Sequence, residues 1–570
     1  MEKLKIVVIS VVLVACSQIG WAQEEKKEEA VPEVELEEMV VTATKTPINV
    51  REVPASVNVV TSEEIKLRAQ TDNFYDAIRN VPGLNITYEG TRPVTYIRGA
   101  RPSILINGRE MSQFAGFYHL YGGLIGMGAV DRIEVLKGPQ SAVHGSKALS
   151  GVINVILKKG DKDYPYVEAG GFAGHGDQLQ GSLRVGGGYD KLSYFLNVGA
   201  ENQPEWETSD GPIPFTEGRK QNIYSRFDYE LNKKHTLSLE YMYNEGTEIS
   251  GGKGTFYQQL STWRFIYDQD YKLHGAFLSY QGDFTDWFSL YASFGLGKND
   301  YEWTMGPNGT MDPAYYPGGD TLDEYLNKEN VGKALEDFTT GEIRGTFDLL
   351  PENRLRAIAG VQYKDTELDW TWRQYNNLVL DVQEDEMYIA PYLQVEYRPI
   401  HHALLTAGVR YDSYDSGNKD SQKTSPRVGL SLFPFAHTDR NWTTLWASYS
   451  EAFKAPQANQ LYHLYGGNPD LEPEEAEGWE GGLKQRVGKW ANLEFSYFDT
   501  NYKDQILYTW DPSTFTGMFK NVGKSRTKGY EALLEVYPTS WLTLHFGYMD
   551  LDMKDEITGK NIPLQPEKIY

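Results

Sequence analysis

From Tyr164 to the end of the chain, apolar and polar residues alternate one by one. The apolar positions of one such segment are Leu237, Leu239, Tyr241 and Tyr243, and residues 491–497 and 542–549 follow the same rule. A period of two is typical of β-strands, in which successive side chains point to opposite faces. The pattern therefore predicts strands with one apolar and one polar face. Both a soluble sandwich and an outer-membrane barrel have such strands.

The lengths of the connections distinguish these two folds. Tight links follow the even-numbered segments, at residues 187–191, 232–235, 285–287, 351–354, 399–402, 436–441, 488–490 and 538–541. Long links follow most odd-numbered segments, at residues 201–221, 244–270, 301–335, 455–473 and 502–522. Short turns at one end and long loops at the other are typical of a transmembrane antiparallel β-barrel. We count seventeen strands by Asp550 and place the start of an eighteenth at Tyr570.

Residues 54–159 have a different pattern, which predicts a small α/β domain. Helices are expected from Ser62 and over residues 72–80, where Val81-Pro82-Gly83 ends the second. Short strands are expected at residues 96–98, 103–106, 132–136 and 152–157. The Gly-rich aromatic stretch between Met111 and Met127 has no core periodicity. It is typical of a loop that contacts a ligand.

The N-terminus predicts export from the cytoplasm. Lys3 and Lys5 precede an apolar run over residues 6–15, which is too short to span a bilayer. We predict a signal peptide over residues 1–22, cut after Ala22. The alternative is a lipoprotein cut before Cys16, the one cysteine of the chain. Either cut excludes disulfides and thiolate metal sites from the mature protein.

Residues 23–53 predict a flexible arm, because they are rich in Glu and Lys and have too few apolar residues to form a core. Within the arm, Met39-Val40-Val41-Thr42-Ala43 is a short β-prone island. Such a peptide is suited to pairing as an added strand with the sheet edge of a partner protein.

Composition excludes several other classes. The 570 residues include 39 Tyr and 55 Gly, and the mean hydropathy of −0.51 excludes a bundle of membrane-spanning helices. A formal charge of −24 argues against a nucleic-acid partner. No phosphate-binding loop, metal-protease motif or convincing nucleophile is present. We therefore predict a protein that is not an enzyme and that has no metal site and no cofactor.

Several motifs, in order along the chain, carry a family resemblance. Residues 39–44 (MVVTAT) resemble a TonB box, and residues 132–154 (RIEVLKGPQSAVHGSKALSGVIN) closely resemble the late plug motif of TonB-dependent outer-membrane receptors. Residues 96–99 (YIRG) resemble the earlier plug element, and residues 450–474 and 528–531 resemble a late extracellular loop and a later strand start. The chain is identified as a member of this family over residues 39–570.

The resemblance implies a 22-stranded barrel in the outer membrane, occluded by an N-terminal plug. The expected domains are the arm, a plug over residues 54–159 and a barrel over residues 164–570. About four or five strands would then be missing, so we expect the sequence to be a C-terminal truncation. The resemblance also implies a partner: residues 39–43 would pair with TonB, which acts with ExbB and ExbD. Outer-membrane lipid would surround the barrel.

The resemblance further implies a latch between plug and barrel. Plug cations near the IRG and KGP elements correspond to Arg98 and Lys137, and their carboxylate partners correspond to Glu480 and Glu531. Alternation places both glutamates on the polar, luminal face of their strands. Relatives often have Arg at the position of Lys137, and Lys cannot make a bidentate contact. The alternative is that these are ordinary hydrated charges of the lumen.

The ligand is expected to be a scarce metal chelate, and a ferric siderophore is the favoured interpretation. Cobalamin and haem are the alternatives, and a passive porin or an adhesin are the rival classes. His119 and His463 are a candidate pair of haem ligands. Alternatively, aromatic residues of the same two loops stack on a macrocyclic ligand. The candidate ligand-binding residues are Phe114, Phe117, Tyr118, His119, Tyr121, Tyr462, His463 and Tyr465.

Overall fold

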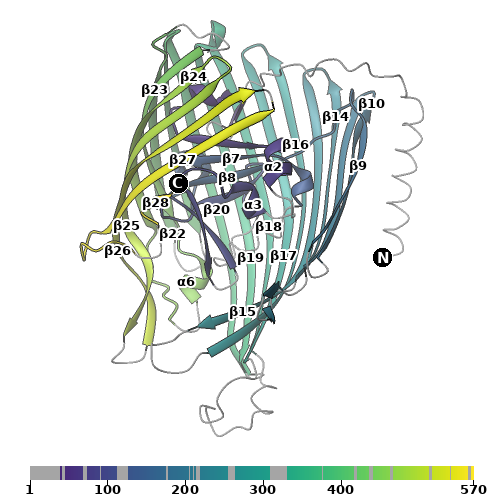
Figure 1. The fold of residues 1–570 in the computed structure, drawn as a ribbon, viewed down its shortest axis with the longest axis vertical. Coiled ribbons are helices and arrows are strands. Elements are labelled where there is room, and N and C mark those ends of the chain that lie inside the picture. Colours follow the sequence, from purple (N-terminus) through teal and green to yellow (C-terminus); the bar gives the residue numbers. More distant parts are fainter. Residues whose placement is uncertain are drawn as a thin grey trace.

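The protein is described by a computed structural model. It describes residues 39–40, 45–68, 74–89, 92–111, 126–174, 178–203, 206–208, 211–213, 218–254, 263–307, 330–374, 377–415, 420–435, 441–462, 466–511, 516–539, 541–562 and 566–569. Within these ranges, eighteen antiparallel strands form one closed barrel around the N-terminal elements (Figure 1). The predicted barrel with a luminal plug, and about 17–18 strands in this chain, is confirmed.

Each barrel strand pairs with its neighbours along the chain. The strands are β9 (Tyr166–Ala173), β10 (Leu179–Tyr189), β11 (Leu192–Gln203), β14 (Gly218–Asn232), β15 (His235–Gly254), β16 (Trp263–Thr285), β17 (Phe288–Pro307), β18 (Asn330–Leu350), β19 (Leu355–Gln374), β20 (Asn377–Ile400), β21 (Ala403–Asp415), β22 (Asp420–Leu432), β23 (Asn441–Lys454), β24 (Glu474–Val487), β25 (Ala491–Asp511), β26 (Thr516–Thr539), β27 (Leu542–Asp555) and β28 (Lys568–Ile569). A separate ribbon contains β12 (Trp206–Thr208) and β13 (Gly211–Ile213).

The barrel is apolar outside and polar inside, the reverse of a soluble protein. On β15, Leu239 is 49% exposed while its neighbour Glu240 is 1% exposed. Aromatic residues beside the tight turns also face outward, and Trp287 and Trp541 are 52% and 80% exposed. An outer-membrane barrel has this distribution, because hydrocarbon surrounds the wall and aromatic girdles lie at the interfaces. Among the described residues, no helix is long and apolar enough to cross a membrane.

The described tight turns lie where the sequence predicts them, while residues 436–440 and 540 of two predicted turns lie outside the described residues. Several loops are shorter than predicted. β15 continues to Gly254 and β16 begins at Trp263, both inside the predicted loop 244–270. Likewise, β25 and β26 extend to Asp511 and from Thr516, inside the predicted loop 502–522. A membrane crossing needs only about 9–11 residues of a strand. Beyond the bilayer the paired ribbons continue in water, where no apolar face is required, so alternation fails there.

The plug is a small α/β unit in the lumen. Its sheet has the order β3-β7-β8-β6 and contains β3 (Val57–Thr61), β6 (Ser103–Ile106), β7 (Val130–Lys137) and β8 (Gly151–Leu157). A hairpin of β4 (Leu84–Glu89) and β5 (Arg92–Ile97) and the helices α2 (Ser62–Arg68), α3 (Phe74–Ile78) and α4 (Ser141–His144) complete it. Helices α2 and α3 and strands β5 to β8 were predicted from the sequence, whereas β3, β4 and α4 were not.

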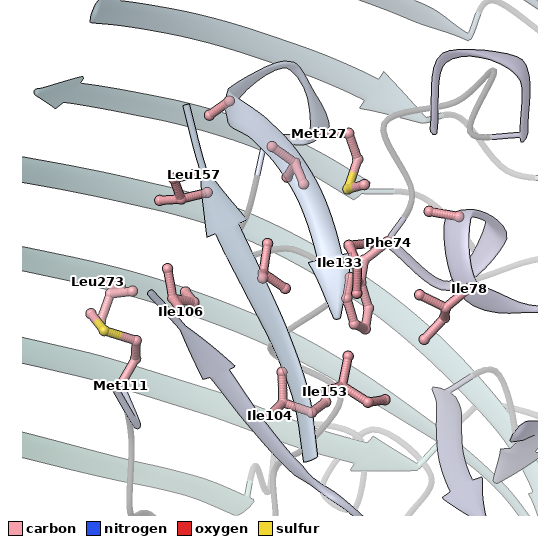
Figure 2. Packing of buried hydrophobic residues seen from close by; sticks show 14 of the residues in the cluster. Phe74, Ile78, Ile104, Ile106, Met111, Met127, Ile133, Ile153, Leu157 and Leu273 are labelled. Atoms are coloured by element: carbon pink, nitrogen blue, oxygen red, sulfur yellow. The ribbon is translucent and has the colours of Figure 1, made fainter. Parts of the chain in front are cut away.

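A continuous apolar core joins plug and wall. Phe74 and Ile78 of α3 pack toward the sheet residues Ile133 and Ile153, and Met111 lies beside Leu273 of β16 (Figure 2). A second cluster joins residues 48–57 of the entering chain to Leu404 and Phe433, which lie beside tight turns of the barrel. The chain therefore enters the lumen at the short-turn end.

Candidate ligand site and plug contacts

A strained turn presents Arg98 at the edge of the plug. Arg98 (φ 50) and Gly99 (φ 84) both adopt left-handed backbone, as in a type I′ turn. Glycine adopts this conformation without strain, whereas it is strained for arginine, which has a Cβ atom. Hydrogen bonds in both directions between Ile97 and Ala100 hold the turn, and the Arg98 N–H donates to the Gly83 carbonyl at 3.0 Å. The turn thus fixes the direction of one long cationic side chain.

The four predicted latch residues are brought together. Arg98 Nη1 donates to Glu480 Oε2 at 2.8 Å, and Arg98 Nε donates to Glu531 Oε1 at 3.0 Å. Lys137 Nζ, at the end of β7, donates to Glu531 Oε2 at 2.8 Å. The Arg98 guanidinium carbon lies 4.0 Å from the centroid of the Phe498 ring, on the strand between the two glutamates.

These charges are almost completely buried. The side chains of Arg98 and Lys137 are 3% and 2% exposed, and those of Glu480 and Glu531 are 8% and 4% exposed. Burial alone would lower the pKa of Arg98, but the carboxylates of Glu531 and Glu480 raise it well above its usual value. Plug and barrel are thus joined by a compact set of charge-assisted hydrogen bonds.

Further ion pairs join the plug and the arm to the wall, and the sequence did not predict them. Arg109 Nη2 donates to Glu240 Oε1 on β15 at 2.6 Å, and Asn107 Nδ2 donates to Glu240 Oε2 at 2.7 Å. Lys45 Nζ lies 3.3 Å from Glu342 Oε1 on β18. The sequence could have indicated Glu240, because alternation in residues 237–244 places it on the luminal face. No comparable pattern marks Arg109, its partner in the plug.

The arm forms a short hairpin of its own. Met39 and Val40 make strand β1, which pairs with β2 (Ile48–Asn49) in the register Met39↔Asn49 and Val40↔Ile48. The other predicted TonB-binding residues, Val41, Thr42 and Ala43, lie outside the described residues. The Ile48 side chain is buried with Val53, Leu404 and Phe433. The described start of the TonB box is therefore held close to the short-turn end of the barrel.

Most of the predicted ligand-binding residues lie outside the described residues. These are Phe114, Phe117, Tyr118, His119, Tyr121, His463 and Tyr465. Tyr462 is described and ends helix α6 (Ala458–Tyr462), near the long-loop end of the barrel (Figure 1). Tyr462 lines a cavity there, which we call the outer pocket.

The outer pocket lies between the barrel wall and the segment around α6. Strands β18 to β22 contribute its wall, and described residues from 455–462 and 469–473 contribute its other side. Its lining includes the acidic residues Glu336, Glu384, Asp385 and Glu386, together with Tyr414 and Tyr462. Glu384 and Glu386 are on the luminal face of β20, whereas Asp385 between them is exposed on the outer face. The acidic residues were not predicted, although the run Glu384-Asp385-Glu386 was a visible signal. Among the described residues, no three His, Cys, Asp or Glu side chains come together as a metal-binding group.

Family comparison identifies the chain. A model described as the TonB-dependent receptor plug domain matches residues 49–152, and one described as a TonB-dependent receptor-like β-barrel matches residues 297–570. The chain belongs to the TonB-dependent receptor family. The receptor is therefore an outer-membrane β-barrel protein, as predicted. The family consists of receptors and transporters, so the prediction that the chain is not an enzyme is also confirmed.

Individual relatives are distant but cover most of the receptor. The iron-regulated outer membrane virulence protein of Vibrio cholerae is 24% identical over 556 residues, which cover 90% of this chain and 77% of that protein. The hemin receptor of Yersinia enterocolitica is 24% identical over 574 residues, which cover 92% of this chain and 79% of that protein.

Among solved structures, the ferripyoverdine receptor of Pseudomonas aeruginosa matches with a TM-score of 0.76 at 18% identity, covering 93% of this chain and 75% of that chain. The siderophore receptor PiuA of Acinetobacter baumannii matches with a TM-score of 0.70 at 18% identity, covering 92% and 84%. At these identities the likeness shows the shared fold.

Proposed function

We propose that the receptor imports a ferric siderophore across the outer membrane by TonB-dependent active transport. The observation that carries the proposal is the plug inside the barrel, joined to the wall by the buried ion pairs of Arg98 and Lys137. A passive porin needs no such plug, because diffusion requires an open lumen. Opening this lumen requires work on the plug.

We propose that TonB supplies this work through the arm, with ExbB and ExbD as the other components. Residues 39–43 would pair with TonB as an added strand, a mode in which backbone hydrogen bonds provide the affinity. The arm lies close to the short-turn end of the barrel, where Arg398 Nη2 lies 2.7 Å from Glu52 Oε2. In this proposal, Arg98, Lys137, Glu480 and Glu531 form a reversible latch that a pull on the arm releases.

The choice of ligand is supported by the relatives. Two similar solved structures are receptors for ferripyoverdine and for a siderophore, and the Vibrio relative is named as iron-regulated. Haem is the second candidate, because the Yersinia relative is named a hemin receptor and the sequence offers His119 and His463. Cobalamin remains the alternative suggested by the loop motif at residues 466–474.

Growth rescue tests the proposal. The receptor is expressed in a strain without its own receptors for iron chelates, haem and cobalamin, and growth is measured on each under limitation. We expect growth on at least one ferric siderophore, and loss of that growth when TonB is deleted. Growth on haem that is lost in the His119→Ala, His463→Ala double variant would favour haem. Growth on the ligand without TonB would refute active transport.

A further inference from the structure

The outer pocket carries an excess of negative charge. Its described lining includes four acidic residues, Glu336, Glu384, Asp385 and Glu386, and no lysine, arginine or histidine. Three of them are on the luminal face, Glu336 on β18 and Glu384 and Glu386 on β20, and β19 lies between these two strands. Their fields therefore add within one enclosed space, where low-dielectric walls strengthen the potential.

Part of this lining has unused bonding capacity. Thr366 of β19 lines the pocket and is 4% exposed, yet its Oγ1 has no hydrogen-bond partner among the described residues. A buried hydroxyl without a partner is costly unless a ligand or water supplies one. Glu386 of β20 lies opposite Thr366 in the strand register and shares its luminal face, whereas Asp385, the residue before it, is exposed on the outer face. The pocket thus combines a hydroxyl that has no hydrogen-bond partner among the described residues with a carboxylate on the strand beside it.

The nearest cations do not neutralise the pocket. Lys147 Nζ lies 2.6 Å from Glu110 Oε1, and Lys364 Nζ lies 3.8 Å from Glu110 Oε2. Glu110 is a plug residue, and neither lysine lines the outer pocket. Counting Glu110 with the three luminal carboxylates Glu336, Glu384 and Glu386, four negative charges stand against the two lysines, so the local charge remains negative.

From this geometry we infer that the receptor selects metal chelates that carry a positively charged group, such as a protonated amine or a guanidinium, and rejects anionic chelates. The inference rests on the proposed function and specifies its substrate class. The cationic group would lie against Glu384 and Glu386, which share the luminal face of β20, and Thr366 would hydrogen-bond a polar atom of the ligand. Tyr414 and Tyr462 would contact its apolar part. An anion in this space would face like charges without compensation, which is how a site excludes a competitor.

Three matched probes test the selectivity. They are a ferric trihydroxamate that bears a protonated amine, its N-acetyl derivative, which is neutral, and its N-succinyl derivative, which is negative. Binding to the purified receptor is measured by intrinsic tryptophan fluorescence. We expect affinity to fall from the positive to the negative probe by at least about tenfold. Equal or tighter binding of the negative probe overturns the inference, as does growth through this receptor on an anionic ferric chelate.

A matched pair of variants assigns the effect to the pocket. In Glu384→Gln with Glu386→Gln, the preference for the positive probe should disappear. Glu367→Gln is the control, because Glu367 is exposed on β19 and does not line the outer pocket. A preference that survives in the double variant overturns the inference.

A second measurement needs no ligand and no loss-of-charge variant. Ser421 lines the pocket, and the chain has one cysteine, Cys16. In Ser421→Cys, a cationic methanethiosulfonate reagent should react about tenfold faster than an anionic one of similar size. Equal rates overturn the inference even if the other variants fail to fold.

The dependence of uptake on TonB is measured separately, so that the two proposals can fail independently. Charge selection by a receptor whose uptake does not need TonB would refute the transport proposal alone. TonB-dependent uptake of anionic chelates would refute the charge selection alone.

Discussion

At the scale of single residues, Glu531 is the centre of the plug contacts. It accepts hydrogen bonds from both Arg98 and Lys137, whereas Glu480 accepts one from Arg98. Loss of Glu480 leaves Arg98 with a remaining carboxylate. Loss of Glu531 leaves Lys137 without its carboxylate partner in a buried site, and removing one member of a buried pair typically costs about 3–5 kcal/mol.

We therefore predict that Glu531→Ala loosens the plug more than Glu480→Ala, and that the double variant loosens it most. The measurement is channel conductance of the purified receptor in planar bilayers as urea is raised. The variants should conduct at lower urea than the wild type. Asp552→Ala is the control, because its pair with Lys528 is exposed. Conductance unchanged in the double variant would count against the latch.

Lys45 gives the arm a pH dependence. Burial lowers the pKa of the Lys45 ammonium from its usual 10.5 to about 8, against the attraction of Glu342 and with repulsion from Arg410 and Arg344. A released Lys45 regains its usual pKa, so undocking the arm takes up a proton between these two values. Because undocking takes up a proton, raising the pH favours the docked arm. Between pH of about 8 and 10.5, the ratio of docked to undocked arm should rise by up to about tenfold per pH unit.

A nitroxide label on Met39→Cys measures this equilibrium by electron paramagnetic resonance. We predict that the mobile fraction of the label falls as pH rises through that window. In a Lys45→Met background the fraction should not change with pH. A mobile fraction that rises with pH in the Lys45 protein contradicts the account.

The sequence predicted some of these residue contacts and missed others for a physical reason. Alternation placed Glu480 and Glu531 in the lumen, and family motifs supplied Arg98 and Lys137 as their partners. The pair Lys45–Glu342 joins residues 297 positions apart, and no motif marks it. Long-range pairing depends on how the plug is oriented in the barrel, which a local pattern does not contain.

At the scale of elements, the hairpin of β1 and β2 occupies the strand edge that a partner would use. Met39 and Val40 already pair with Asn49 and Ile48, so an incoming TonB strand must displace β2 or wait for the hairpin to open. Ile48 is 5% exposed and anchors β2 in the wall cluster.

We predict that Ile48→Ala raises the affinity of the receptor for the purified periplasmic domain of TonB. Truncating a buried isoleucine costs about 2–5 kcal/mol, here in the docked arm. Opening of the hairpin then takes less free energy before TonB binds. The measurement is titration calorimetry, with Leu67→Ala as the control because Leu67 is 77% exposed. Unchanged or weaker TonB affinity in Ile48→Ala would contradict the prediction.

The barrel strands could be predicted from the sequence where they are long and have one face toward lipid. The tight turns coincide with the predicted ones because Gly, Pro and charged residues interrupt alternation there. The paired extensions of β15–β16 and β25–β26 have the sequence pattern of loops, because strands in water need no apolar face. The short strands β3 and β4 lie inside the plug, where burial on more than one side removes alternation.

At the scale of the whole molecule, the reversed burial and the turn asymmetry have one common cause. Lipid requires an apolar exterior and a backbone with no unpaired edge, and a closed barrel satisfies both. The lumen can then be polar, and the plug fills it with an apolar core of its own and charged contacts to the wall. The sequence alone separated this arrangement from a sandwich by its connection lengths. The acidic outer pocket required the fold, since its carboxylates come from separate strands.

The central claim is that import requires work on the plug through the arm. The most direct measurement is the initial rate of uptake of radioactive iron, at low concentration of the chelate that supports growth, into cells with the wild-type receptor or with residues 39–43 deleted. The account predicts rapid uptake by the wild type that stops on deletion of the segment, on loss of TonB or on addition of a protonophore. Uptake that continues at the wild-type rate under any of these three conditions would contradict it.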